Sequence, residues 1–387
     1  MSSSKQLAVI NGRIVLPDQV IESGHIIIDR GKIAAVSATA RTPTSETIDL
    51  SGATVYPGFI DAHIHGSAGI DVMDASVNAL GQVSAFLVTQ GVTSWLPTLV
   101  PAADDEYQES VRTIEQAARE QSGVARILGV HYEGPFVNSA QCGALHSSHF
   151  KTFDGPQDVD RLPVPSSELV RMITVAPEIA GGIDLIKELE KRGWVISIGH
   201  TRAGVETLDQ AFAAGASHMT HFMNAMPQIH HRKPGPVGWG LARDGVTCDV
   251  IADGVHLDPL ILRLLLKVKT ADRVSLISDA IAAAGRGDGD YQIWGETISV
   301  KEGRTSNAAG NIAGSVVTML DAVKMMRSLG ASEVETARMA ATNPARLLRV
   351  DHDCGSIKEG KRADLLALDQ DGNVRLTIVG GNIVFQV

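Results

Sequence analysis

The feature that most constrains the fold is a series of eight short apolar runs in the middle of the chain. Segments of helix length lie between most of these runs. Eight strands that alternate with helices favour a closed parallel barrel over an open doubly wound sheet. We therefore predict an α/β protein built on a (β/α)8 TIM-like barrel. The expected strands are 58–62, 93–97, 127–132, 172–176, 195–199, 218–220, 247–252 and 274–278, with helices at 76–90, 104–121, 183–191 and 259–269.

Both ends of the chain have a different pattern from the middle. The N-terminal residues contain β-branched runs broken by Asn-Gly, Arg-Gly and Ser-Gly turns, and the C-terminal residues repeat this pattern. The simplest arrangement is one small β-sandwich built from both termini, with the barrel inserted between them. Two further helices are expected at 316–328 and 332–348. We therefore predict a sandwich domain at 1–56 plus 348–387 and a barrel domain at 57–347.

Length and composition exclude several classes of protein. The 387 residues suffice for a barrel of roughly 250 residues and a smaller domain. The net charge of −10 disfavours a nucleic-acid-binding protein. No apolar run reaches the length of a membrane span, and the first residues lack the apolar core of a signal peptide. Cys142, Cys248 and Cys354 are scattered and form no CxxC pair, which predicts a cytoplasmic protein without disulfides.

Imidazole and carboxylate side chains stand at the ends of five predicted strands. In a (β/α)8 barrel all strand C-termini meet on one face, where active sites lie. The His-x-His spacing places two rings on the same side of the first strand, since the side-chain period is two. Such a set suits a divalent first-row metal ion. The groups are His63 and His65 on the first strand, Glu133 on the third, His200 on the fifth, His221 on the sixth and Asp279 on the eighth, and His256 follows the seventh.

This arrangement predicts metal-dependent hydrolysis of an amide. Asp279 is the natural group to take the proton of the attacking water and to pass it to the leaving nitrogen. Other polar residues have a structural interpretation: Asp71 and Asp74 orient a turn and cap the next helix. Asp253 either holds His256 or closes a turn. We interpret six further histidines as packed polar residues: His131, His149, His218, His230, His231 and His352.

Several motifs resemble a known family. PGFIDAHIHG, at 57–66, resembles the opening barrel motif of the amidohydrolase superfamily. EGPF, GHT, THFMNAMPQIHHRKPG, DGVH and SDA together resemble its N-acetylglucosamine-6-phosphate deacetylase family, and GSIKEGKRADL extends the resemblance to nearly the whole chain. The resemblance implies hydrolysis of the acetamide of N-acetyl-D-glucosamine 6-phosphate to D-glucosamine 6-phosphate and acetate, in amino-sugar catabolism and cell-wall recycling.

The resemblance also implies a role for each matching residue. Glu133, His200 and His221 would hold the catalytic metal, and His63 with His65 would hold a second ion. The ions would be one or two per chain, Zn first, with Fe, Mn or Co as alternatives. Asp279 would be the proton donor and acceptor, and His256 would contact the sugar or its acetyl carbonyl. The implied substrate-binding residues are Ala144, Leu145, His146, Asn224, Ala225, Arg232 for the phosphate, His256, Ile312, Ala313, Gly314 and Ser315.

Other interpretations stay open at this point. The resemblance implies a homodimer, in which the second phosphate ligand can come from the partner. Other candidates within the superfamily are an N-acetylgalactosamine-6-phosphate deacetylase and a cyclic-amide or N-acyl-amino-acid hydrolase. The latter two commonly use a carboxylated lysine, whereas Glu133 occupies that kind of position here. A metal-binding sensor barrel without activity is the alternative outside enzymes, and the presence of Asp279 argues against it.

Overall fold

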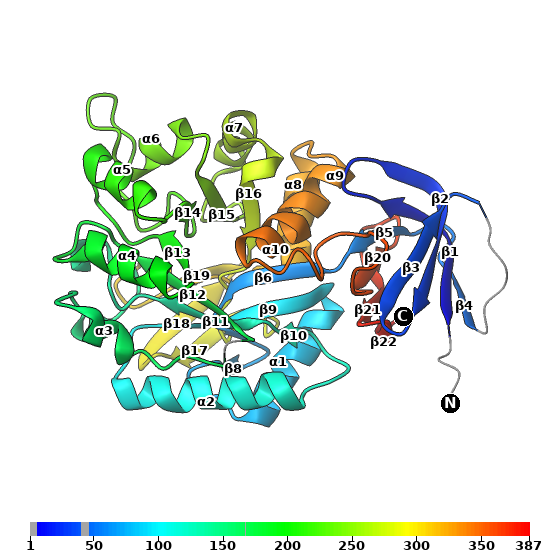
Figure 1. Cartoon of the computed structure of the whole chain (residues 1–387), viewed down its shortest axis with the longest axis horizontal. Helices are drawn as coiled ribbons and strands as arrows, with labels where there is room; N and C mark the ends of the chain where they lie inside the picture. The colour runs from blue at the N-terminus through cyan, green and yellow to red at the C-terminus, as the bar shows by residue number, and fades with distance from the viewer. Residues whose placement is uncertain (1–5, 40–45, 167) are drawn as a thin grey trace.

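The computed structural model describes residues 6–39, 46–166 and 168–387, and it contains the predicted barrel (Figure 1). Consecutive barrel strands pair in parallel, so the chain order is also the spatial order. All eight expected strands are present within a few residues of their predicted limits. They are β6 (Phe59–Ile64), β9 (Val92–Leu99), β11 (Gly129–Glu133), β12 (Val170–Val175), β13 (Val195–Ile198), β14 (His218–Met219), β15 (Thr247–Ile251) and β16 (Val274–Ile277), with a short β10 (Arg126–Ile127) beside β9.

The barrel closes between its last and first strands. Ile64 and Ala280 form a parallel bridge, and the backbone N–H of Asp279 donates to the carbonyl of His63 at 2.9 Å. Every residue of β6 and β9 is buried, because helices cover one face and the barrel interior the other. The ends of β6 and β16 therefore lie side by side, which places their polar residues together.

Helices cover the outside of the barrel. In the long helix α2 the buried residues Tyr107, Val111 and Ile114 recur at helical spacing and face the strands. No helix in the described part of the chain is long and apolar enough to cross a membrane. The helices are α1 (Val77–Thr89), α2 (Asp104–Glu120), α3 (Pro156–Asp160), α4 (Gly182–Lys191), α5 (Val205–Ala213), α6 (Gly235–Ala242), α7 (Pro259–Lys269), α8 (Met319–Ser328), α9 (Glu333–Ala337) and α10 (Asn343–Leu347).

Short elements connect these helices and strands. A π-helical stretch, η4 (Arg338–Thr342), joins α9 to α10, so the single helix expected at 332–348 is present with an irregular middle. Two short strands follow β6 as a small ribbon. The remaining short elements are β7 (Gly66–Ser67), β8 (Ile70–Asp71), η1 (Ser139–Gln141), η2 (Ser147–His149) and η3 (Ala271–Arg273).

Both termini form one sheet beside the barrel, as predicted (Figure 1). The antiparallel pair β5–β20 joins the N-terminal strands to the C-terminal ones. The sheet bends back on itself, so that N-terminal and C-terminal segments meet a second time. There the N–H of Ile33 donates to the carbonyl of Lys361, and the N–H of Ala363 donates to the carbonyl of Gly31. The domain limits of 1–56 plus 348–387 stay a prediction. The strands are β1 (Leu7–Val15), β2 (Val20–Asp29), β3 (Lys32–Ser37), β4 (Glu46–Asp49), β5 (Thr54–Pro57), β20 (Leu365–Leu368), β21 (Val374–Val379) and β22 (Asn382–Gln386).

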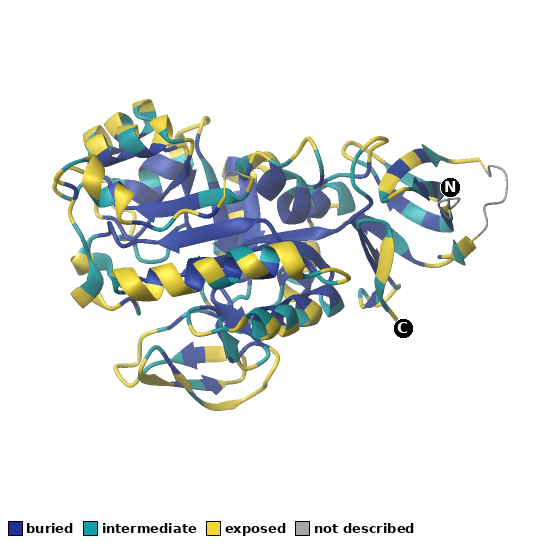
Figure 2. Ribbon diagram, turned by 60° about the horizontal axis from the view of Figure 1, so that its bottom comes forward, coloured by how far each residue is buried: buried dark blue, intermediate teal, exposed yellow. Residues whose placement is uncertain are grey.

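A small antiparallel sheet after β16 was not among the predicted elements. It consists of β17 (Gly289–Ile293), β18 (Glu296–Lys301) and β19 (Arg304–Ser306), and it projects from the barrel (Figure 2). Trp294 and Gly295 connect β17 to β18 in a two-residue turn. Both have a positive φ, of 53° and 77°, as a tight hairpin turn requires. The tip of this hairpin reaches the open end of the barrel.

Candidate metal centre

The structure brings the six predicted strand-end groups together at one end of the barrel. Nε2 of His200 and Nε2 of His221 each lie 2.9 Å from Oε1 of Glu133. Nε2 of His65 lies 3.2 Å from Oε2 of Glu133 and 3.2 Å from Oδ1 of Asp279. His63 joins the group through its Nε2, which is 3.2 Å from that of His65. The carboxylate of Glu133 thus lies between two pairs of histidines, and each pair with Glu133 could hold a metal ion.

The backbone is constrained at the same positions. His200, His221 and Asp279 have φ values of 47°, 30° and 50°, in the left-handed region that residues other than glycine rarely adopt. Each of the three stands two residues after the last residue of its strand. Backbone conformations of this kind concentrate at functional sites.

The protonation pattern of the imidazoles fits a bound cation. Nδ1 of His65 faces the carbonyl of Thr98 at 3.0 Å, and Nδ1 of His200 faces that of Gln141 at 2.8 Å. A carbonyl can only accept, so each Nδ1 carries the hydrogen and, in a neutral ring, Nε2 carries a lone pair. These lone pairs point at carboxylate oxygens of Glu133. Acceptors that face acceptors need a positive charge between them, and imidazole with carboxylate is a ligand set for divalent ions.

The electrostatics agree with this assignment. Burial by itself would lower the pKa of His65 and of His221, but the neighbouring carboxylates raise these pKa values. Contacts with Asp279 and Glu133 raise the pKa of His65 to about 10, and the contact with Glu133 raises that of His221 to about 9. Burial would raise the pKa of Glu133, whereas the surrounding imidazoles hold it well below its usual range. The protein groups therefore favour positive charge at the nitrogens. A divalent ion held by these groups would supply that charge in place of the protons.

Two buried aspartates outside the predicted set support the ligands. Asp249 accepts a hydrogen bond from the backbone N–H of His221 through one oxygen, and its other oxygen lies 3.0 Å from Nε2 of His218. Asp61 accepts from the backbone of His63 at 3.4 Å. His218 is therefore a packed polar residue, as predicted. Sequence reasoning missed both aspartates, although Asp61 stands two residues before His63 and so faces the same side of β6.

Asp253 fulfils both of the roles considered for it. Its Oδ1 accepts from the backbone N–H groups of Val255 and His256, each at 2.8 Å, and closes the turn after β15. Its Oδ2 lies 2.7 Å from Nδ1 of His256. Burial would raise the pKa of Asp253, but the contacts with His256 keep it below its ordinary value. Asp253 thus stays ionised and fixes the orientation of the His256 ring.

Five of the six groups, all but His63, line a cavity of about 180 Å³. Nδ2 of Asn224 is buried there without a hydrogen-bond partner among the described residues, so it is available to a ligand. Gly143 and Trp294 also line the cavity, and the sequence carried no signal for either. The cavity brings together seven of the predicted substrate-binding residues: Ala144, Leu145, Asn224, Ala225, His256, Ile312 and Gly314.

The other four predicted substrate-binding residues do not line the cavity that the described residues form. His146 donates from Nε2 to the carbonyl of Trp294 at 2.9 Å. Arg232 is exposed, with its guanidinium 2.7 Å from Nε2 of His231. Ala313 and Ser315 are buried in the protein instead. Ser315 donates its hydroxyl to the carbonyl of Ser278 at 2.5 Å and thereby fixes the end of β16.

Comparison with known proteins agrees with this geometry. The pattern of the amidohydrolase family matches residues 54–384. An N-acetylglucosamine-6-phosphate deacetylase of Bacillus subtilis (strain 168) is 37% identical over 99% of this chain and 98% of the relative. An N-acetylgalactosamine-6-phosphate deacetylase of Escherichia coli O157:H7 is 33% identical over 96% of this chain and 97% of the relative. The match therefore spans both the barrel and the terminal sheet.

A solved structure shows the same fold. The crystal structure of N-acetylglucosamine-6-phosphate deacetylase from Thermotoga maritima superimposes with a TM-score of 0.89 at 34% identity. It covers 98% of this chain and 100% of the other. The hairpin sheet and the terminal sheet thus fall within the matched length.

Proposed function

The chain belongs to the amidohydrolase family, and we propose that it hydrolyses N-acetyl-D-glucosamine 6-phosphate to D-glucosamine 6-phosphate and acetate, in amino-sugar catabolism. The observation that carries this proposal is the Glu133–His200–His221 cluster, which opens into a cavity that also contains Asp279 and His256. Relatives of full length and more than 30% identity are deacetylases of phosphorylated amino sugars.

The arrangement of the imidazole and carboxylate groups supports an assignment of the metal ligands. We assign Glu133, His200 and His221 to one divalent ion, and His63, His65 and Glu133 to a second. Zn²⁺ is the first choice for this nitrogen and oxygen set. When bound, the ion polarises the acetyl carbonyl and lowers the pKa of water.

The position of Asp279 supports a role in proton transfer. Its Oδ1 lies 3.3 Å from Nε2 of His63 and 3.2 Å from Nε2 of His65, at the wall of the cavity. The carboxylate accepts a proton from the attacking water and returns it to the leaving nitrogen, which must be protonated to depart. The two histidines keep the carboxylate ionised, since they hold its pKa below the ordinary value against the effect of burial.

Polar groups of the loops after β14 and β15 orient the sugar. Nδ1 of His256 is turned to Asp253, which leaves Nε2 for contact with the sugar or its acetyl carbonyl. Asn224 offers its unpartnered amide to a substrate oxygen. Arg232 lies on the exposed loop after β14, and its guanidinium can bind the phosphate by paired, charge-assisted hydrogen bonds.

We further propose a cytoplasmic homodimer. Leu260, Leu264 and Val268 are 68%, 46% and 44% exposed and recur every four residues, so they form one apolar face on α7. A second copy of the chain would cover this face. Sedimentation of the wild type and of Leu264→Glu tests the dimer, because the added charge would dissociate it.

The cysteines support the cytoplasmic location. None of the three cysteines in the described part of the chain forms a disulfide, as a reducing compartment favours.

A direct assay tests the activity. The purified protein is given N-acetylglucosamine 6-phosphate, its unphosphorylated form and N-acetylgalactosamine 6-phosphate in parallel, and acetate release is measured. We expect the glucosamine phosphate to be hydrolysed most efficiently. Absence of acetate release from both phosphosugars would contradict the proposal. Preference for the galactosamine epimer would move the assignment to the function of the relative from E. coli O157:H7.

A further inference from the structure

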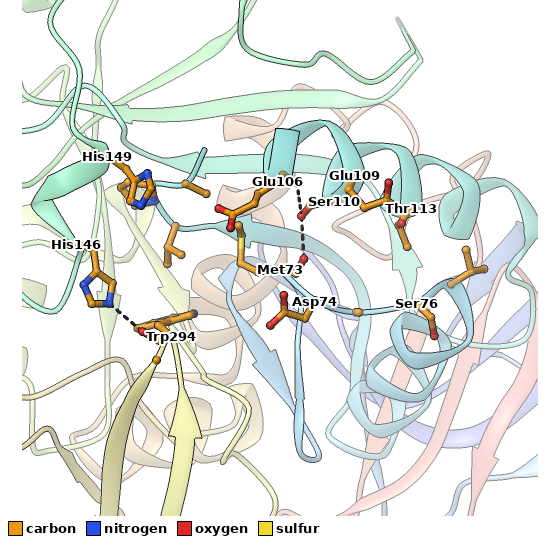
Figure 3. A pocket seen from close by; sticks show the side chains of 16 residues that line it. Met73, Asp74, Ser76, Glu106, Glu109, Ser110, Thr113, His146, His149 and Trp294 are labelled. Carbon is orange, nitrogen blue, oxygen red and sulfur yellow. Dashed lines mark hydrogen bonds between the residues drawn. The ribbon is translucent and has the colours of Figure 1, made fainter. Parts of the chain in front are cut away.

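Two cavities meet at a single side chain. Beside the metal centre lies a larger cavity of about 800 Å³, between α2, the loop before α1 and the tip of the β17–β18 hairpin (Figure 3). Among the described residues that line these two cavities, Trp294 is the one that lines both. Its indole therefore forms part of the wall between the catalytic cavity and the larger one.

Several contacts hold Trp294 in this position. Its ring meets that of His65 edge to face, with centroids 5.2 Å apart and planes at 84°. Its carbonyl accepts the hydrogen bond from His146, at 2.9 Å (Figure 3). The indole packs on the buried apolar cluster that contains Val100 and Leu145. The hairpin tip is thus held by contacts with His65, with His146 and with this apolar cluster.

The catalytic cavity has a polar and an apolar part. Asn224 and His256 provide polar groups for the sugar, whereas Leu145, Trp294 and Ile312 provide apolar surface. Of these, Trp294 lies against His65. An acetyl group has a polar oxygen and an apolar methyl group. The methyl group gains most when it packs on the apolar part of the cavity.

We propose that Trp294 limits the length of the acyl group that the site accepts. This inference rests on the proposed deacylation of an N-acylated amino sugar phosphate. In the wild type the indole stops the acyl chain after the acetyl methyl group. When the side chain is small, the two cavities join, and an aliphatic acyl chain can extend past position 294 toward Met73 and Val100.

The test compares acyl chains of increasing length. The wild type, Trp294→Ala and Trp294→Phe are each assayed with the N-acetyl, N-propanoyl and N-butanoyl derivatives of glucosamine 6-phosphate. We expect Trp294→Ala to raise the ratio of kcat/KM for butanoyl over acetyl by about tenfold or more, since one methylene group in an apolar pocket changes selectivity by 10–200-fold. Trp294→Phe keeps an aromatic wall and should leave this ratio near that of the wild type.

A second substitution checks where the longer chain lies. Met73 lines the larger cavity close to its centre (Figure 3), and Met73→Trp in the Trp294→Ala background should refill the space and restore the preference for acetyl. If Trp294→Ala slows all three substrates equally, the inference is overturned and Trp294 has a structural role. Trp294→Leu gives the same readout if the alanine variant does not fold. The wild-type rate on the acetyl substrate tests the proposed function separately.

Discussion

Ser278 donates both its backbone N–H, at 3.2 Å, and its hydroxyl, at 2.5 Å, to the carboxylate of Asp61. Asp61 lies on the first barrel strand, two residues before His63, and Ser278 lies directly before Asp279. The pair therefore joins the first and last strands where the barrel closes. It also fixes the proposed proton carrier relative to the two histidines of β6.

The first prediction concerns the stability of this closure. Ser278→Ala removes the hydroxyl that donates to Oδ2 of Asp61. The carboxylate of Asp61 is fully buried, so Oδ2 loses this hydrogen bond without gaining one to water. A buried polar group that loses its partner costs about 1–3 kcal/mol, and more when it is charged. We expect the free energy of unfolding to fall by about that amount, measured by urea denaturation.

A matched control is available on a neighbouring strand. Ser94 on β9 is also fully buried, but its hydroxyl has no hydrogen-bond partner among the described residues. Ser94→Ala should therefore leave stability unchanged or raise it slightly. If both variants lose the same free energy of unfolding, the Asp61–Ser278 hydrogen bond does not contribute the stability proposed for it.

The second prediction concerns the metal content. Because Glu133 belongs to both groups of three ligands, Glu133→Ala should deprive the protein of nearly all bound metal. His65→Ala changes only one of the two ligand groups, so this variant should lose about half of the bound metal. Elemental analysis of protein purified without chelator measures both. Wild-type protein that is active and free of metal would contradict the metal assignment.

The third prediction concerns recognition of the phosphate. Arg232→Ala removes the proposed guanidinium–phosphate hydrogen bonds, so KM for the phosphorylated sugar should rise roughly tenfold to a hundredfold. KM for the unphosphorylated sugar should change little. Lys233→Ala, one residue along the same exposed loop, serves as the control. Equal losses on both sugars would mean that Arg232 supports the loop instead.

The sequence predicted the centre of the site better than its edges. Glu133, His200 and Asp279 could be placed because parallel barrel strands all end on one face, so that residues far apart in the chain converge. Trp294 could not be placed in this way. It lies in a hairpin inserted after the last strand, and its contact with His146 joins residues 148 positions apart with no repeating pattern between them.

In segments without regular periodicity, only some of the predicted substrate-binding residues line the cavity. The NIAGS segment was expected to contact substrate along 312–315, but the chain bends at Gly314, where φ is 54°. Ile312 and Gly314 line the cavity, whereas Ser315 turns inward to hold Ser278. Sequence spacing does not indicate where an irregular segment bends, so the fold decides which of its residues face the site.

The last prediction concerns Asp279. Asp279→Asn keeps the size and shape of the side chain but removes its ability to accept and return a proton. We expect kcat to fall by roughly 10²–10⁴-fold, the usual contribution of general acid–base catalysis. KM and metal content should stay close to those of the wild type, because the three ligands Glu133, His200 and His221 are unchanged. Steady-state kinetics and elemental analysis of the same preparation distinguish the possibilities. A variant that retains most of its kcat would exclude the proton transfer, whereas loss of metal would make Asp279 a ligand, as its 3.2 Å approach to Nε2 of His65 allows.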